Sequence, residues 1–313
     1  MLSRLAESLF WIGRYVERAE DTARILDVHV LTMLEDTAAD EELTSRSLLA
    51  VMGVPLPPSR VDVRSVTDLL AFDPLTTASI VSSLTAAREN ARGARDVISS
   101  EMFNCLNRSY NALPGEQSLA RRQGPSSFFA FVRESGAEFH GLADSTMSRD
   151  EGWLFLVLGR SLERVDMATR LLATRVVDQG STATWVTLLR SFGAYEAYLR
   201  SYRNAVDAEK VAEFLLLDRL FPRSVFSSLR RAEQCALELS PAVARVGVND
   251  ELTRAIGRVR SRLEYLRPGE LTQDLPALLI RLQAAVAEAG EAAASRYFRS
   301  ASTPTSWLQE VPA

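Results

Sequence analysis

One stretch of this chain occurs twice. Residues 10–26 read FWIGRYVERAEDTARIL and residues 156–172 read LVLGRSLERVDMATRLL, and at an offset of 146 they share six residues without gaps. A second pair, SIVSSLTAARENA at 79–91 and SVFSSLRRAEQCA at 224–236, agrees at an offset of 145. Two collinear matches at nearly one offset indicate an internal duplication, and the period is too long for a solenoid.

The duplication predicts two similar helical halves, residues 1–147 and 148–300, related by a pseudo-twofold and packed as one compact domain. A chain of 313 residues is long enough to bury a full apolar core without disulfides or metals. Residues 301–313 are polar and contain prolines, so we expect them to form a C-terminal tail.

The apolar residues are spaced as in helices nearly throughout. From Leu5 to Met33 they fall at alternating steps of four and three, which predicts one face of a helix about 30 residues long. No window alternates cleanly enough for a strand, so the sequence predicts an all-α, multi-helix bundle. Further helices are expected at 75–112 (ended by Pro114-Gly115), 126–145, 149–178, 182–204, 207–219, 223–239, 250–266 and 274–299.

The repeated helix carries a charged stripe beside its apolar face. Positions 13, 17, 20 and 24 share one narrow line on a helical wheel, and the second half repeats the line. The stripe and the arginines next to it are Gly13, Arg14, Glu17, Arg18, Glu20 and Arg24 in the first half, and Gly159, Arg160, Glu163, Arg164, Asp166 and Arg170 in the second.

This stripe has two structural interpretations. Its charges could form ordinary i,i+4 pairs on a solvated face, each worth roughly 0.2–0.5 kcal/mol. Alternatively, the two repeat helices cross closely at Gly13 and Gly159 and exchange buried Glu–Arg pairs, of which breaking one costs about 3–5 kcal/mol. We favour the crossing, because surface pairs do not require paired glycines. A catalytic role for the same carboxylates ranks third.

Three motifs give the chain a family resemblance. They are GRxxER at Gly13–Arg18 and again at Gly159–Arg164, ARENAR at Ala87–Arg92, and LADSTMSRDEGWLFLVLGRSLER at Leu142–Arg164. Together they resemble the alpha-E domain family of bacterial all-helical proteins, over almost the whole chain from Leu2 to Phe298. The resemblance implies association with circularly permuted ATP-grasp amide ligases and transglutaminase-like peptidases, in peptide synthesis or protein tagging. It names partners rather than a reaction.

The sequence offers no strong catalytic or cofactor motif. Its two histidines, His29 and His140, lack the Glu-x-x-His and His-x-x-x-His spacings, so neither a metal site nor a bound cofactor is predicted. Neither phosphate-binding glycine loop occurs, nor does a Gly-x-Ser-x-Gly elbow. Cys105 and Cys235 are expected to be buried, unreactive thiols of a reducing compartment. No catalytic residue is therefore assigned.

A polar, basic helix edge follows the second repeat block. It is either a solvated face or a surface for an acidic partner or a phosphate group. The formal charge of −4 provides no basic field for nucleic acid. The residues of this edge are Arg88, Asn90, Arg92, Arg95, Asn107 and Arg108.

Two functional hypotheses follow. The first is a non-catalytic helical accessory or scaffold protein that works with the ATP-grasp ligase and the transglutaminase-like protein. The second is an enzyme acting on amide or peptide bonds through the duplicated Glu/Arg helix. The missing motifs favour the first. Charges among the first 34 residues and the lack of about 18 consecutive apolar residues predict a cytoplasmic protein without membrane spans. A homo-oligomer is compatible with the sequence.

Overall fold

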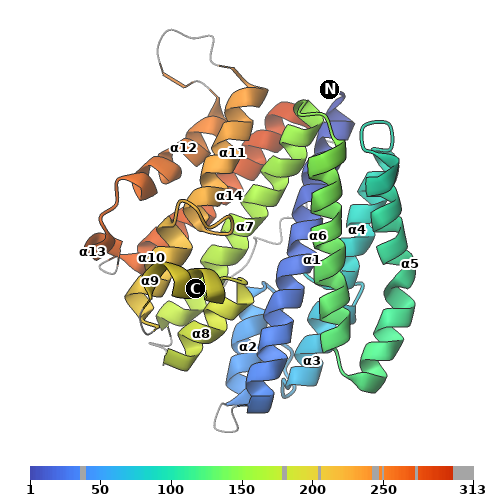
Figure 1. Ribbon diagram of the computed structural model, residues 1–313, viewed down its shortest axis with the longest axis vertical. Coiled ribbons are helices and arrows are strands. Elements are labelled where there is room, and N and C mark those ends of the chain that lie inside the picture. Colours follow the sequence, from blue (N-terminus) through green and yellow to red (C-terminus); the bar gives the residue numbers. More distant parts are fainter. Residues whose placement is uncertain are drawn as a thin grey trace.

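The computed structural model describes residues 1–35, 40–177, 182–203, 206–241, 247–248, 250–271 and 274–298. Within these ranges the regular structure is entirely helical (Figure 1), which confirms the predicted all-α class. Among the same residues, none of the helices combines the length and the apolar character needed to cross a bilayer. The expected tail, residues 301–313, lies outside the described part of the chain.

Two long helices form the centre of the molecule. They are α1 (Ser3–Glu35) and α7 (Glu151–Val177), and they lie side by side in Figure 1. Phe10 of α1 lies beside Gly159 of α7, and Arg164 lies beside Glu17, so the two helices run in the same direction. Their apolar faces supply much of the core, and Leu9, Ile12, Leu158 and Leu162 are fully buried.

Each central helix is covered by its own set of helices. On α1 pack α4 (Ile80–Gly93) and α6 (Ser126–Thr146), and α5 (Ser100–Gln123) lies against both of these. On α7 pack α11 (Val225–Leu239) and α14 (Leu275–Tyr297), and α12 (Glu251–Glu264) lies against both. The helix order is therefore the same around α1 and around α7. This order agrees with the predicted halves, residues 1–147 and 148–300. The division itself stays a prediction.

Shorter helices complete the fold. No helix is predicted from the sequence for residues 40–72, yet three of these short elements lie there. The shorter helices are α2 (Glu41–Val51), α3 (Val63–Thr67), the π-helix η1 (Asp68–Phe72), α8 (Thr182–Ser191), α9 (Tyr195–Tyr202), α10 (Ala208–Leu217) and α13 (Pro268–Leu271).

The loops that lead into α4 and α11 have the same construction. In each, an aspartate side chain accepts a hydrogen bond from the backbone N–H of a leucine two residues later. A serine then donates its hydroxyl hydrogen to the carbonyl of that aspartate and accepts the N–H at the third position of the next helix, as an N-cap. These residues are Asp73, Leu75 and Ser79 before α4, and Asp218, Leu220 and Ser224 before α11.

Two of the predicted helices were wrong in extent. The range 75–112 contains two helices, because Ser99 caps a new helix by accepting a hydrogen bond from Met102 N. That helix continues through Pro114, an exposed residue whose missing backbone N–H removes one intrahelical hydrogen bond. Arg121 and Arg122 lie in the last turn of this helix. The range 182–204 breaks at Gly193, whose φ of 60° lies in the left-handed region.

The glycines of the repeat allow α1 and α7 to touch along their backbones. A Cβ atom on Gly13 would lie 2.1 Å from the carbonyl oxygen of Leu156, and one on Gly159 would lie 2.0 Å from that of Phe10. Leu156 lies three residues before Gly159 in α7, and Phe10 lies three residues before Gly13 in α1. The contact is therefore the same from either side. The close crossing predicted from the sequence is confirmed.

Replacing either glycine with alanine should force α1 and α7 apart. We expect Gly13→Ala and Gly159→Ala each to lower the free energy of unfolding by about 1–3 kcal/mol or more, as overpacking in cores does. Gly141→Ala in α6 is the control, since a Cβ there meets nothing within 4 Å, and it should stabilise by up to about 1 kcal/mol. Urea denaturation measures all three. Equal stability of Gly13→Ala and Gly141→Ala would contradict the crossing.

Candidate functional site

The two central helices exchange arginines at the crossing. Arg18 of α1 donates through Nε to Oε1 of Glu163, at 2.6 Å. Arg164 of α7 donates through Nε to Oε1 of Glu17, also at 2.6 Å. Both carboxylates are completely buried. The predicted interhelical Glu–Arg pairs are therefore present, and each central helix supplies a carboxylate that accepts from an arginine of the other.

The carboxylate of Glu163 is held by a second arginine as well. Arg14 Nε donates to Oε2 of Glu163 at 2.6 Å, and Arg18 donates to both oxygens, so Oε2 accepts from two arginines. Burial alone would raise the pKa of Glu163, but Arg14 and Arg18 lower it to about 2. One turn further along α7, Asp166 accepts from Arg170 at 3.0 Å. This group is the Glu163 cluster: Arg14, Arg18, Glu163, Asp166 and Arg170.

The carboxylate of Glu17 has different neighbours. Arg223, from the loop before α11, lies 3.0 Å from Glu17 Oε1 and also contacts Glu20 and Asp21. Burial raises the pKa of Glu17, yet Arg164 and Arg223 hold it well below its ordinary value. Burial also raises the pKa of Asp21, to about 7, against the opposing effect of Arg223. The Glu17 cluster consists of Glu17, Glu20, Asp21, Arg24, His140, Arg164 and Arg223.

His140 reaches this cluster from α6. Its Nε2 lies 3.2 Å from Glu17 Oε2 and 3.9 Å from Glu20 Oε2, and the three atoms all lie within 4.8 Å of one another. Burial lowers the pKa of His140, which favours the neutral imidazole. Two carboxylate oxygens and a neutral imidazole nitrogen are a set that can hold a metal ion. The spacing argument from sequence did not find this group, because its members lie on different helices.

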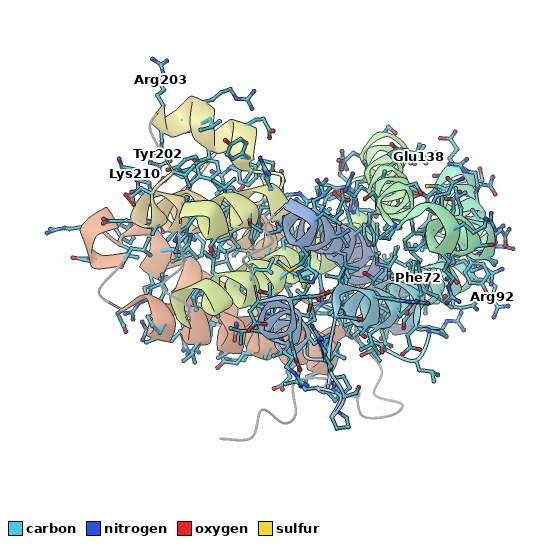
Figure 2. All side chains as sticks on the ribbon, turned by 90° about the horizontal axis from the view of Figure 1, so that it is seen from below. Phe72, Arg92, Glu138, Tyr202, Arg203 and Lys210 are labelled. Atoms are coloured by element: carbon cyan, nitrogen blue, oxygen red, sulfur yellow. The ribbon has the colours of Figure 1, made fainter. Side chains whose placement is uncertain are left out.

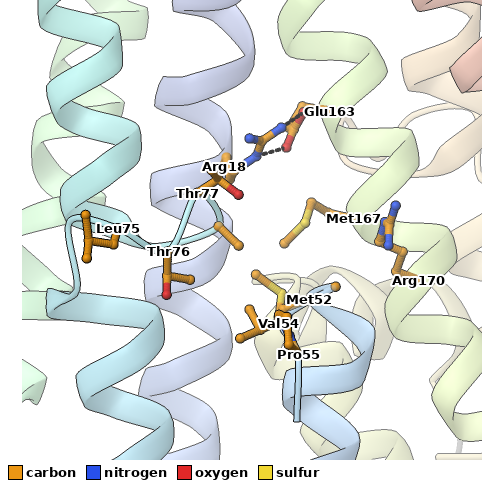
Figure 3. A pocket seen from close by; sticks show the side chains of 12 residues that line it. Arg18, Met52, Val54, Pro55, Leu75, Thr76, Thr77, Glu163, Met167 and Arg170 are labelled. Atoms are coloured by element: carbon orange, nitrogen blue, oxygen red, sulfur yellow. Dashed lines mark hydrogen bonds and ion pairs between the residues drawn. The ribbon is translucent and has the colours of Figure 1, made fainter. Parts of the chain in front are cut away.

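A cavity of about 200 Å³ opens beside the Glu163 cluster (Figure 3). In the repeat alignment Ala78 takes the place of Arg223 and Met167 takes the place of Asp21. This side of the crossing therefore lacks the Arg–Asp pair that the other side has. The lining consists of Arg18, Glu163 and Arg170 with Met52, Gly53, Val54, Pro55, Leu75, Thr76, Thr77, Ala78 and Met167.

The basic edge predicted from the sequence lies on α4, α5 and the turn between them, with acidic residues beside it. Arg88 and Arg92 both pair with Glu89, and Arg108 pairs with Glu138 of α6. Arg92 and Glu138 lie on the opposite side of the molecule from Arg203 and Lys210 (Figure 2). The remaining members make local contacts: Arg88 donates to Asn107, Asn90 donates to the carbonyl of Ala86, and Arg95 lies over the ring of Phe103.

The structure thus brings most of the predicted stripe together and adds residues to it. Arg160 lies near Arg164, and burial, assisted by Arg164, lowers its pKa. Sequence reasoning missed Asp21, His140 and Arg223 as site residues. Extending the repeat alignment upstream of Ser224 would have exposed Arg223 opposite Ala78, whereas nothing in the sequence signals His140. The cysteines are buried, and burial raises the pKa of Cys105 to about 11 and that of Cys235 to about 12.

Comparisons with known proteins complete this description. A family model called Alpha-E, a predicted alpha-helical domain with a conserved ER motif, matches residues 1–298. Uncharacterized proteins of Mycobacterium bovis and Mycobacterium tuberculosis are each 28% identical over 298 residues, which cover 86% of this chain. The chain spans about a third of the length of these relatives. No solved structure matches it.

Removing one buried carboxylate should destabilise the protein far more than removing a surface one. Glu163→Ala removes the buried carboxylate to which Arg14 and Arg18 both donate, so we expect a loss of about 3–5 kcal/mol in the free energy of unfolding. Glu42→Ala, which breaks the partly exposed pair with Arg46, should change it by less than about 1 kcal/mol. Adding Arg18→Met to Glu163→Ala should recover part of the loss. Similar denaturation midpoints for Glu163→Ala and Glu42→Ala would contradict the buried pairing.

The low pKa of Glu163 makes part of the stability depend on pH. Because this carboxyl titrates near 2 in the fold against an ordinary value of 4.5, its contribution is complete above about pH 4.5 and is lost as the pH falls towards 2. Glu163→Gln should therefore be less stable than the wild type at pH 6, with the difference shrinking below pH 4.5. Urea midpoints measured from pH 6 to pH 2.5 test this. A difference that stays constant would contradict it.

Proposed function

Because this chain belongs to the Alpha-E family, we propose that it acts as a non-catalytic helical accessory protein. In this role it works with an ATP-grasp amide ligase and a transglutaminase-like peptidase, in peptide synthesis or protein tagging. The chemistry would take place on these partners, and the helical bundle would bring them or their peptide substrate together.

The observation that carries this proposal is how the paired motif is used. Glu17, Arg18 and Glu163 are buried and Arg164 is half-buried, and the two motifs are bonded to each other across the helix crossing. A general base works best with a pKa near the operating pH, whereas arginines hold the pKa of both glutamates low. The motif is therefore suited to fixing α1 against α7, and this favours a structural role over proton transfer.

The relatives support a role beside other protein modules. This chain matches about a third of their length, so in those proteins the helical region shares a polypeptide with about twice as much further sequence. A helical module that shares a polypeptide with further sequence is typical of a component that acts next to its partners.

The duplicated loops offer a surface for docking. Leu75 and Leu220 occupy the same position in the two loops. Leu75 is 88% exposed and Leu220 is 92% exposed. Each is fixed by the hydrogen bond from its backbone N–H to an aspartate. An exposed leucine held in this way gives a partner an apolar contact that requires little ordering on binding. We assign the two loops as partner contacts.

The cavity beside Glu163 favours one alternative, an enzyme acting on amide or peptide bonds. Glu163, Arg18 and Thr77 line a space large enough for a small part of a peptide. Both oxygens of Glu163 are already bonded to arginines, which makes this carboxylate a weak base and a poor nucleophile. We therefore place the enzyme second.

Co-expression with the ATP-grasp and transglutaminase-like proteins of the same organism tests the accessory role. We expect a complex that co-elutes in size-exclusion chromatography at micromolar concentration. Leu75→Asp combined with Leu220→Asp should abolish co-elution because it places charges in an apolar contact. Ile280→Asp on α14 changes another exposed apolar residue and should leave the complex intact.

Activity assays distinguish the two candidates. The accessory role predicts ATP turnover or peptide modification by the partners, altered by this chain, and none by the chain alone. Cleavage or ligation of peptides by the isolated chain that is lost in Glu163→Gln would overturn it in favour of the enzyme. Failure of any complex to form would also overturn it.

A further inference from the structure

We propose that Glu17, Glu20 and His140 bind a divalent transition-metal ion of the Zn²⁺ or Mn²⁺ class. This site goes beyond the proposed accessory role and does not depend on the partners assigned there. Its ligand atoms are Oε2 of each glutamate on α1 and Nε2 of His140 on α6.

The spacing of these atoms fits a shared ion. Metal–ligand bonds of about 2.0–2.2 Å place neighbouring ligand atoms roughly 3.0–3.5 Å apart. Nε2 lies 3.2 Å from Glu17 Oε2 and 3.9 Å from Glu20 Oε2. A side-chain rotation that shortens the distance between Nε2 and Glu20 Oε2 by about 0.5 Å would give the spacing that a shared ion requires.

The two closest of these atoms contact each other without a well-aligned hydrogen bond. Glu17 Oε2 and His140 Nε2 lie 3.2 Å apart, and neither makes a hydrogen bond of good geometry, although Glu17 is 0% exposed and His140 only 9%. A buried polar atom left unpaired costs about 1–3 kcal/mol, and such atoms are rare in folded proteins. An ion bound between the two helices would satisfy Glu17 Oε2 and the imidazole nitrogen Nε2 together.

The other oxygen of each glutamate is already fixed. Glu17 Oε1 accepts from Arg164 and lies 3.0 Å from Arg223, and Glu20 Oε1 accepts from Arg24 and Arg223. Each carboxylate thus presents one oxygen to arginines and the other towards His140. Hydrogen bonds that orient the ligating groups in this way are a regular feature of metal sites in proteins.

Helix α6 leaves room for the second carboxylate. Gly136 lies one turn before His140, and a Cβ at this position would be 3.1 Å from Glu20 Oε2. A larger residue there would press on the atom that the site needs. The glycine and the histidine therefore act together, one giving space and the other a ligand.

The ligand types and the surrounding charge define the ion. An imidazole with two carboxylates suits Zn²⁺, Mn²⁺ or Fe²⁺ better than Ca²⁺ or Mg²⁺, which prefer oxygen ligands alone. The Glu17 cluster contains three carboxyl groups and the arginines Arg24, Arg164 and Arg223. Because these arginines oppose an added cation, we expect micromolar affinity rather than the tight binding of structural zinc sites.

Titration of the chelator-treated, untagged protein with Zn²⁺ tests the proposal. Isothermal titration calorimetry should give one bound ion per chain, and Zn²⁺ should raise the melting temperature. His140→Gln and Glu20→Gln should each lower the affinity at least tenfold. His29→Gln is the matched control, since the other histidine is also buried but lies beside Ser45, and it should bind as the wild type does.

Spectroscopy keeps the test valid if His140→Gln does not fold. In the His29→Gln protein, His140 is the single remaining histidine. Pulsed electron paramagnetic resonance of Mn²⁺ bound to this protein should show coupling to one imidazole nitrogen. Lack of that coupling, unchanged affinity in folded His140→Gln or Glu20→Gln, or no binding at millimolar Zn²⁺ would each overturn the proposal.

Discussion

The fold depends on a close crossing of two helices that exchange buried charges. Gly13 and Gly159 let the backbones of α1 and α7 touch, with no room for a Cβ on either. That approach brings Glu17 and Glu163 within reach of the facing arginines and out of water. Close approach and buried ion pairs require each other here, because a wider crossing would admit water and weaken the pairs. The outer helices on each side are then placed by the central helix they cover.

The two sides of the crossing differ in the residues that surround the buried glutamate. Around Glu17, Arg223 and Asp21 fill the space, and His140 adds an imidazole beside two carboxylate oxygens. Around Glu163, Ala78 and Met167 stand at the aligned positions, and a cavity of about 200 Å³ opens there. Differences at a few aligned positions of the sequence repeat thus separate a dense polar cluster from an open pocket. The difference makes a separate role for each side physically reasonable.

The sequence predicted those features that repeat or recur at a fixed period. Helical spacing predicted the all-α class, and the paired glycines and glutamates predicted the crossing and its ion pairs. Features that depend on distant segments were missed: His140 reaches the site only because α6 packs on α1, and Arg223 only because its loop lies over the same helix. Pro114-Gly115 predicts a helix end, but α5 continues through Pro114, which is exposed. The sequence does not tell whether the proline ring will face solvent. Tertiary packing decides each of these.

Native-state hydrogen exchange tests most directly whether the crossing unites the molecule. The amides to compare lie in α1 around Gly13 and in α7 around Gly159. If the exchanged arginines and the glycine contact hold the two sides together, the most protected amides of both helices exchange with one free energy, equal to that of global unfolding, and with the same dependence on denaturant. If one helix and its covering helices open at a lower free energy while the other side stays protected, each side is stable without the crossing and the account is contradicted.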